Sequence, residues 1–140
     1  MTETISNLME ANLLGVFNER DARRRAAMIK ATYSSDVRWT DDEGTTVGRE
    51  ALDAKATALQ SQMQGLVFSR AGPVYETRGL GYLAWELGPD GGEPVACGFD
   101  VAVVRNEVIS ELYTVITDSR PGNTQSPAAA ADDGDGPSQG

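Results

Sequence analysis

The most informative feature of this sequence is what it lacks. Its 140 residues contain no histidine and a single cysteine, Cys97. A Ser-His-Asp triad, a Cys-His pair and a zinc site built on histidine are therefore excluded, and no internal disulfide can form. Any chemistry must come from carboxylates, tyrosines, arginines, lysines or the one thiol. Because Cys97 has no histidine partner, we expect it to be an inert buried thiol.

Positive charge and long apolar runs are also scarce. The sequence has 12 Lys and Arg against 21 Asp and Glu, for a formal net charge of -9. This charge argues against a nucleic acid or an anionic membrane as a partner. No apolar run is long enough to cross a bilayer, and Met1 to Glu10 contains no basic residue, unlike a secretory signal. We therefore expect a cytoplasmic protein with no membrane contact.

The composition changes abruptly near the C-terminal end. Residues 118–140 are rich in Pro, Gly, Ser, Ala and Asp and contain no large apolar side chain. Such a segment cannot bury enough surface to offset the entropy lost on ordering. We expect one folded domain over residues 1–117 and a disordered acidic tail over residues 118–140. The tail is interpreted either as a tolerated extension or as a solubility or tethering element.

The spacing of apolar residues predicts helices first and strands afterwards. Apolar residues at three- and four-residue steps predict helices over residues 5–17, 22–32 and 48–65. A short strand is expected between the second and third of these, over residues 37–42. Alternating patterns then predict four antiparallel strands in a meander, over residues 67–75, 78–87, 95–104 and 108–117. Together these elements predict an α+β sandwich.

Both faces of the expected strand over residues 95–104 are largely apolar. One face presents Cys97, Phe99, Val101 and Val103, and the other presents small residues and Asp100. A strand of this kind is covered on both sides. We expect the helices to cover one face and a second copy of the chain to cover the other, which predicts a homodimer through the sheet. Asp100 is then a carboxylate in a mostly buried strand, where a charge needs an explanation.

Several short strings occur in an order that resembles a known family. They are Trp39-Thr40-Asp41-Asp42-Glu43-Gly44, Val47-Gly48-Arg49-Glu50-Ala51, Trp85-Glu86-Leu87-Gly88-Pro89, and Gly98-Phe99-Asp100-Val101 followed by Ile109 to Tyr113. Over about residues 5 to 117 the sequence resembles the SnoaL-like branch of the nuclear transport factor 2-like superfamily. Asp42 replaces a usual proline, and Asn106 to Ile109 replaces a common D-G-R-I turn.

The resemblance implies a fold but no single function. It implies a cone-shaped half-barrel, in which three N-terminal helices pack on a curved, mainly antiparallel sheet and enclose a hydrophobic pocket, usually in a homodimer. The family includes ketosteroid isomerase-like enzymes, epoxide hydrolases of the limonene type, polyketide cyclases, dehydratases and non-catalytic binding or assembly modules. Function therefore has to be argued from individual residues.

Asp100 and Asp41 are the first candidates for catalysis. An apolar cone would raise the pKa of Asp100 and make it a usable general acid or base, and the alternative is a structural aspartate. Asp41 follows the pocket-facing aspartate of the family, and the alternative is a turn or capping role. An arginine between them would give the Asp-Arg-Asp arrangement of the epoxide hydrolases. Arg70 and Arg78 are the available strand arginines, and the sequence places neither between the carboxylates.

Tyrosines and other aromatic residues complete the predicted site. Tyr113 is the third catalytic candidate, as a phenolic donor to a developing oxyanion, with ordinary packing as the alternative. The residues expected to contact a ligand are Trp39, Trp85, Tyr33, Tyr82 and Phe99. We expect no metal and no cofactor. The leading hypothesis is a cofactor-independent acid-base enzyme of the isomerase, cyclase, dehydratase or epoxide hydrolase type, acting on a hydrophobic small molecule. The alternative is a non-catalytic ligand-binding or dimeric assembly module of the same fold.

Overall fold

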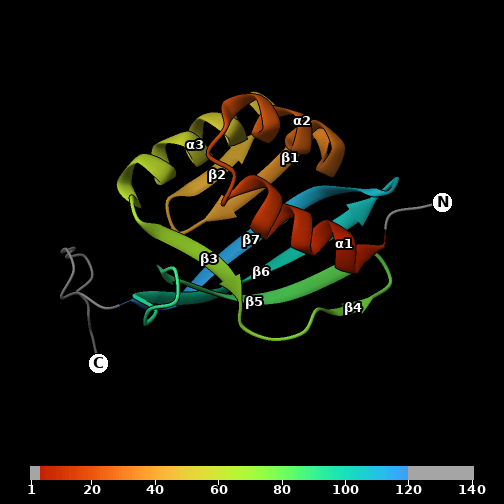
Figure 1. The fold of residues 1–140 in the computed structure, drawn as a ribbon. Coiled ribbons are helices and arrows are strands. Elements are labelled where there is room, and N and C mark those ends of the chain that lie inside the picture. Colours follow the sequence, from red (N-terminus) through yellow and green to blue (C-terminus); the bar gives the residue numbers. More distant parts are fainter. Residues whose placement is uncertain (1–3, 120–140) are drawn as a thin grey trace.

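The computed structural model describes residues 4–119, in which helices lie over one face of a curved sheet (Figure 1). Helix α1 (Ile5–Glu10) runs directly into a π-helical segment, η1 (Ala11–Val16). Helix α2 (Ala22–Thr32) and helix α3 (Arg49–Gln62) follow on either side of the first two strands. We call the side of the sheet that faces these helices the inner face and the opposite side the outer face.

Local sequence explains where the helices begin. The side chain of Thr4 accepts a hydrogen bond from the backbone N–H of Asn7 at 3.0 Å, and Asp21 accepts one from Arg24 at 3.0 Å. Both are N-caps that satisfy an otherwise unpaired helix donor. At Gly48, which precedes α3, the backbone has φ of +96°, a conformation that favours glycine.

Within residues 4–119, seven strands form a single open sheet. Their order is β2-β1-β7-β6-β5-β3, and β4 pairs with β5. Only the β1–β7 pair is parallel among the described strands, and the two ends of this order, β2 and β3, do not pair with each other, which leaves a half-barrel. The strand bounds are β1 (Tyr33–Asp41), β2 (Gly44–Val47), β3 (Leu66–Arg70), β4 (Tyr75–Thr77), β5 (Leu80–Pro89), β6 (Ala96–Arg105) and β7 (Val108–Ser119).

The predicted fold class is confirmed, with differences in detail. In the described part of the chain, three helices, the first of them α1 continued by η1, pack on a curved, mainly antiparallel sheet, as expected. Strand β2 was not expected, and the predicted strand over residues 67–75 is divided into β3 and β4. Strand β7 ends at Ser119, two residues beyond the expected domain boundary; the rest of the expected tail, residues 120–140, lies outside the described residues. Within residues 4–119, no helix is long and apolar enough to span a bilayer.

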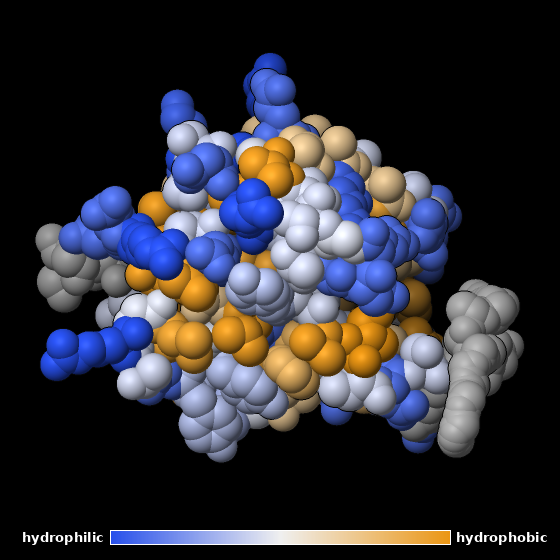
Figure 2. Space-filling view, turned by 180° about the vertical axis from the view of Figure 1, so that it is seen from behind, coloured by the Kyte–Doolittle hydropathy of each residue, from blue (hydrophilic) through white to orange (hydrophobic). Residues whose placement is uncertain are grey.

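The hydrophobic core lies between the helices and the inner face. On β6, Gly98, Asp100 and Ala102 are buried, whereas Phe99, Val101 and Val103 on the outer face are only partly buried. Seen from behind, a band of hydrophobic side chains crosses the lower half of the molecule (Figure 2). The more exposed hydrophobic side chains of the outer face include Leu80, Tyr113 and Val115.

Candidate functional site

A pocket opens on the inner face of the sheet, between the helical segments η1 and α3 and strands β1, β3, β5, β6 and β7. It encloses about 220 Å³, which is compact beside the range of roughly 300–1,000 Å³ typical of ligand sites. Most of its lining is apolar. The polar and charged side chains that line it are Asp41, Asp42, Glu43, Lys55, Asp100 and Thr114.

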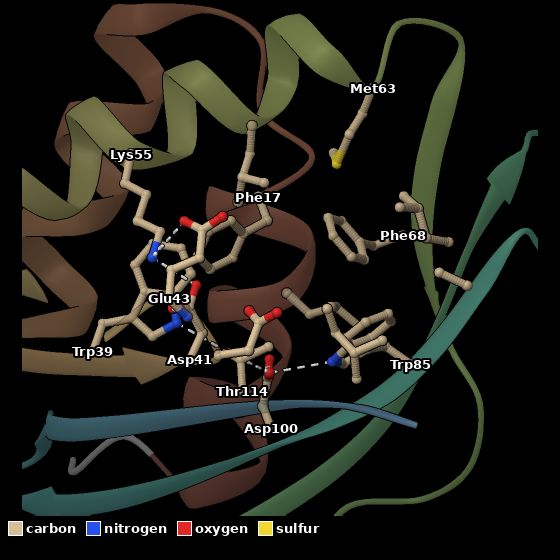
Figure 3. A pocket seen from close by; sticks show the side chains of 16 residues that line it. Phe17, Trp39, Asp41, Glu43, Lys55, Met63, Phe68, Trp85, Asp100 and Thr114 are labelled. Carbon is tan, nitrogen blue, oxygen red and sulfur yellow. Dashed lines mark hydrogen bonds and ion pairs between the residues drawn. The ribbon is translucent and has the colours of Figure 1, made fainter. Parts of the chain in front are cut away.

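Four aromatic rings form a continuous wall of this pocket (Figure 3). The ring centroids of Phe17 and Trp39 are 5.0 Å apart, and those of Phe17 and Phe68 are 6.3 Å apart. The Phe68 ring meets Trp85 edge-on at 5.3 Å. These separations are typical of favourable aromatic pairs. The rings come from three strands and the end of η1, so the wall depends on the complete fold.

Asp100 is the buried carboxylate of the pocket. It lies on β6 and is 3% exposed. Its Oδ2 accepts a hydrogen bond from Asn12 Nδ2 at 2.8 Å. Its Oδ1 accepts two, from Trp85 Nε1 at 3.2 Å and from Thr114 Oγ1 at 2.9 Å (Figure 3). A carboxylate has about four acceptor positions, so one position on Oδ2 has no donor from residues 4–119.

Burial dominates the protonation equilibrium of Asp100. Loss of hydration raises its pKa from 3.8 to about 6, although the hydrogen bonds from Thr114, Trp85 and Asn12 act in the opposite direction. No cationic side chain of the described residues pairs with this carboxylate. A carboxylate with a pKa near 6 is ionised at neutral pH and still basic enough to accept a proton from a bound molecule.

A second layer of side chains fixes the donors that surround Asp100. The hydroxyl of Tyr33 donates to Asn12 Oδ1, so the amide of Asn12 is oriented with its Nδ2 toward Asp100. The indole of Trp39 donates to Thr114 Oγ1 at 3.0 Å, which leaves the Thr114 hydroxyl proton for Asp100. Burial and the nearby charge of Asp100 raise the pKa of Tyr33 well above its ordinary value, so Tyr33 remains a donor.

Glycine at position 98 permits the contact between Trp85 and Asp100. Trp85 and Gly98 are directly paired on β5 and β6. A Cβ atom at position 98 would lie 2.5 Å from Cζ2 of Trp85 and would also collide with the carbonyl oxygen of Val115. Since neither neighbour is the end of a flexible side chain, only glycine lets the indole lie against the strand and reach the carboxylate.

Charged residues gather at the more exposed end of the pocket, which we call the mouth. Lys55 on α3 pairs with Asp41 at the end of β1, with Nζ 2.6 Å from Oδ2, and lies 3.7 Å from an oxygen of Glu43. The same ammonium lies 4.7 Å from the centroid of the Trp39 ring. Asp41 Oδ1 also accepts the backbone N–H of Glu43 at 2.9 Å. Asp41 therefore lines the pocket and also stabilises the turn between β1 and β2.

The structure brings four of the predicted site residues together and separates the others. Asp100, Asp41, Trp39 and Trp85 all line the pocket. Tyr33 lies behind it, in contact with Asn12 rather than with the cavity.

The remaining three predicted residues lie on the outer face, which corrects their assignment to the pocket. Tyr113 neighbours the inward-facing Thr114, so alternation along β7 turns its ring outward, where its hydroxyl donates to Glu111. Phe99 is likewise adjacent to Asp100 and contacts the Tyr82 ring at 5.2 Å. The Asp-Arg-Asp arrangement is not present either, because no arginine lines the pocket among the described residues and Arg70 pairs with Glu10.

Sequence reasoning missed three polar residues of the site. Asn12 and Lys55 each occupy a position in the apolar stripe of a helix. A polar residue at such a position is a signal from which both could have been found. Thr114 could have been found from its register opposite Asp100 in the β6–β7 pair. That register includes two bulges, which local alternation does not predict.

Comparison with known proteins supports the fold alone. No protein-family model and no curated protein matches the sequence. Among solved structures, a candidate isomerase of the SnoaL-like family from Agrobacterium tumefaciens aligns with a TM-score of 0.74 at 22% identity, over 79% of this chain and 95% of that chain. A candidate SnoaL-like polyketide cyclase from Jannaschia aligns with a TM-score of 0.63 at 11% identity, over 78% and 81% of the two chains.

A third solved structure contains a small bound molecule. It is a hypothetical protein with a ketosteroid isomerase-like fold from Catenulispora acidiphila, in complex with trimethylamine. It aligns with a TM-score of 0.63 at 14% identity, over 79% of this chain and 85% of that chain. These similarities show that the chain has the fold of SnoaL-like and nuclear transport factor 2-like proteins, as the sequence resemblance implied.

Proposed function

We propose that this protein is a small cofactor-independent acid-base enzyme, in which Asp100 moves a proton on a compact, largely apolar molecule held in the pocket. The observation that supports this most strongly is the state of Asp100. Its carboxylate is desolvated, lines an apolar pocket and keeps one acceptor position that no donor of the described residues occupies. Its pKa of about 6 lies close to neutral pH, where a general base works best.

The proposed step is removal of a proton from carbon next to a carbonyl group. Asp100 accepts the proton, the electron pair of the C–H bond delocalises onto the substrate oxygen, and the proton returns at another position. Lys55 is the one cation among the described residues that line the pocket, and it would stabilise the negative oxygen. The return of the proton completes an isomerisation, whereas cyclisation and dehydration share only the first part of this step, the removal of the proton. Epoxide hydrolysis has less support, because none of the described residues that line the pocket is the arginine of an Asp-Arg-Asp arrangement.

The comparisons are consistent with this proposal. Two of the proteins that share the fold are a candidate isomerase and a candidate polyketide cyclase. The trimethylamine complex involves a molecule of the compact size that this pocket would admit.

A non-catalytic ligand-binding or assembly module is the second candidate, and one observation favours it. Asp100 already has three protein donors, and Asp41 is neutralised by Lys55. Both carboxylates are thus stabilised without a substrate, as structural residues would be. The two candidates differ in whether loss of the Asp100 charge abolishes a reaction or only changes the stability of the fold.

Exchange of α-protons in deuterated buffer tests the proposal without knowledge of the natural substrate. We would follow cyclic ketones, including 4,4-dimethylcyclohexanone and cyclohexenone, by proton NMR with the wild type and with Asp100→Asn. The wild type is expected to accelerate exchange, Asp100→Asn to lose this acceleration, and Glu111→Gln on the outer face to retain it. Equal rates with the wild type and Asp100→Asn, while the ketone still quenches tryptophan fluorescence, would support the binding module instead.

A further inference from the structure

We infer that the pocket selects a compact organic cation, with a protonated or quaternary nitrogen, over neutral or anionic molecules of the same shape. This inference rests on the proposed function, because it names the class of molecule whose proton Asp100 would move. It is derived from three features of the described residues: the charges that line the pocket, the aromatic wall, and the hydrogen-bond donors that are already occupied.

The charges that line the pocket are mostly negative. Asp41, Asp42, Glu43 and Asp100 contribute four carboxylates, and Lys55 contributes the one ammonium among the described lining residues. Lys55 is committed to Asp41 at 2.6 Å and is farther from Glu43, at 3.7 Å. A cation therefore meets uncompensated negative charge at the mouth of the pocket and at its buried end, whereas an anion would be repelled at both.

Two of these carboxylates lack a close cationic partner within residues 4–119. Asp42 is exposed beside the mouth and takes part in no ion pair there. Asp100 is buried, and its three partners are neutral donors from Asn12, Trp85 and Thr114. An ionised carboxylate in an apolar environment is costly without a counter-ion. A cationic ligand would supply that charge from within the pocket.

The aromatic wall provides a second means of holding a cation. The Lys55 ammonium lies 4.7 Å from the centroid of the Trp39 ring, so one ring of this wall is already in the geometry of a cation–π contact. Phe17, Phe68 and Trp85 continue the wall from Trp39 toward Asp100. Alkyl groups on a ligand nitrogen would pack against these faces without the need for hydrogen bonds.

The donors of the pocket are largely occupied, which disfavours a substrate that becomes anionic. The Trp39 and Trp85 indoles donate to Thr114 and Asp100, and the Thr114 hydroxyl also donates to Asp100. Among the described residues that line the pocket, Lys55 alone remains to meet a developing negative oxygen. When Asp100 takes a proton from the carbon next to the carbonyl of a cationic ketone, the electron pair of the C–H bond moves onto the substrate oxygen and the product is a zwitterion with no net charge. The positive nitrogen then offsets part of the negative charge on that oxygen, so less stabilisation is required from protein donors.

A pair of ketones with the same shape tests the inference. In 1,1-dimethyl-4-oxopiperidinium a quaternary nitrogen replaces the quaternary carbon of 4,4-dimethylcyclohexanone. The protein has two tryptophans, Trp39 and Trp85, and both line the pocket, so quenching of intrinsic fluorescence reports on binding. The cation is expected to bind about tenfold more tightly, in line with the strength of a desolvated cation–π contact. Equal or weaker binding of the cation would overturn the inference.

Paired variants locate the source of the preference. The double variant Asp42→Asn/Glu43→Gln removes two charges at the mouth and is expected to lower the affinity ratio of the two ketones, while Asp100 and the aromatic wall retain part of the preference. Glu76→Gln/Glu111→Gln removes two charges, from an exposed position on β4 and a half-buried one on β7, neither of which lines the pocket. It is expected to leave the ratio unchanged. If both double variants lower the affinity ratio equally, the preference for the cation comes from the net charge of the whole molecule, and this result would also overturn the inference.

The same two ketones separate failure of this inference from failure of the proposed function. If the cation is not preferred but ketone exchange still depends on Asp100, only the inference on substrate class is wrong. If the cation is preferred but neither ketone exchanges faster than in buffer, the preference stands as a property of a binding pocket and the proposed proton transfer is wrong.

Discussion

At the scale of single residues, the buried carboxylate of Asp100 is subject to two opposing effects. Three hydrogen-bond donors stabilise its ionised form, as they do for many structural aspartates. Loss of hydration acts against ionisation and is the larger effect, so the pKa of Asp100 rises to about 6. The donors keep the carboxylate in place, and the apolar surroundings make it basic.

The first residue-scale prediction concerns stability and pH. Because the pKa of Asp100 is higher in the folded state, at about 6, than the ordinary 3.8, the folded state binds this proton more tightly between these pH values. The stability that this bound proton contributes to the folded state is therefore present below about pH 4 and declines as the pH rises through 6. Above that pH, the ionised carboxylate makes the free energy of unfolding independent of the titration of Asp100. The total change is on the order of 3 kcal/mol at 1.36 kcal/mol per pKa unit.

Urea denaturation at pH 4 and pH 8 measures this effect. The free energy of unfolding of Asp100→Asn, relative to the wild type, is expected to increase by about 2.5 kcal/mol between the two pH values. The comparison is made against the wild type at each pH, because other carboxylates titrate in both proteins. If the free energies of unfolding of the two proteins differ by the same amount at pH 4 and at pH 8, Asp100 has an ordinary pKa.

The second residue-scale prediction contrasts two tyrosines. Tyr33→Phe removes the donor to Asn12 in a fully buried position and leaves an unpaired amide oxygen. It is expected to lower the free energy of unfolding by about 1–3 kcal/mol. Tyr113→Phe removes an exposed hydroxyl that donates to Glu111 and is expected to change it by less than about 0.5 kcal/mol. Thermal or chemical denaturation of both variants measures these changes. Equal changes in the free energy of unfolding would contradict the inward placement of Tyr33 and the outward placement of Tyr113.

At the scale of secondary-structure elements, most of the fold follows from local sequence. The second helix begins and ends where the apolar spacing predicts, at Ala22 and Thr32, and the strands from β5 to β7 lie within a few residues of the predicted bounds. Strand β2 lacks an apolar alternation, so it was missed. The parallel pairing of β1 with β7 was also missed, because it joins segments from opposite ends of the domain and has no local signature.

The candidate site was predicted only in part, because local alternation along a strand can be read from the sequence and long-range contacts cannot. Alternation along β6 places Asp100 inward, but it places Phe99 outward, and the same rule applied to β7 turns Tyr113 away from the pocket. Lys55 and Asn12 enter the site only when helices and sheet are packed together. Tertiary contacts, which the sequence pattern does not specify, therefore decide these members of the site.

The element-scale prediction concerns the ion pair that joins α3 to β1. A double-mutant cycle with Lys55→Met and Asp41→Asn is expected to give a coupling energy of about 1–2 kcal/mol, since the pair is largely shielded from solvent. The exposed pair of Arg105 and Glu111 is the control, with an expected coupling of about 0.2–1 kcal/mol. A coupling at positions 55 and 41 that is no larger than the control would show that this ion pair does not hold the mouth of the pocket together.

At the scale of the whole molecule, the outer face of the sheet remains apolar across three strands. Tyr82, Phe99 and Val101 lie next to the more exposed Tyr113 and Val115, on a face that none of the helices within residues 4–119 covers (Figures 1 and 2). We propose, as the sequence suggested, that a second copy of the chain packs there. A homodimer would remove this apolar surface from water and would leave the pocket open on the inner face.

Light scattering after size-exclusion chromatography tests the proposed homodimer. The wild type is expected to have twice the single-chain mass of 14.9 kDa. Val101→Lys places a charge in the middle of the outer face and is expected to give the single-chain mass, with unchanged circular dichroism. Val67→Lys, on strand β3 at the end of the sheet, is the control and is expected to remain dimeric. A wild type with the single-chain mass would contradict the proposal.

The central claim is that Asp100 is a desolvated carboxylate prepared to exchange a proton in the pocket. The most direct measurement is a carboxyl-resolved NMR titration of the aspartates, with Asp100→Asn used to assign the resonance. The account predicts a pKa of about 6 for Asp100. A value at or below the ordinary ~3.9 would show that the hydrogen bonds outweigh burial. Asp100 would then be a structural residue, and the proposed proton transfer would be wrong.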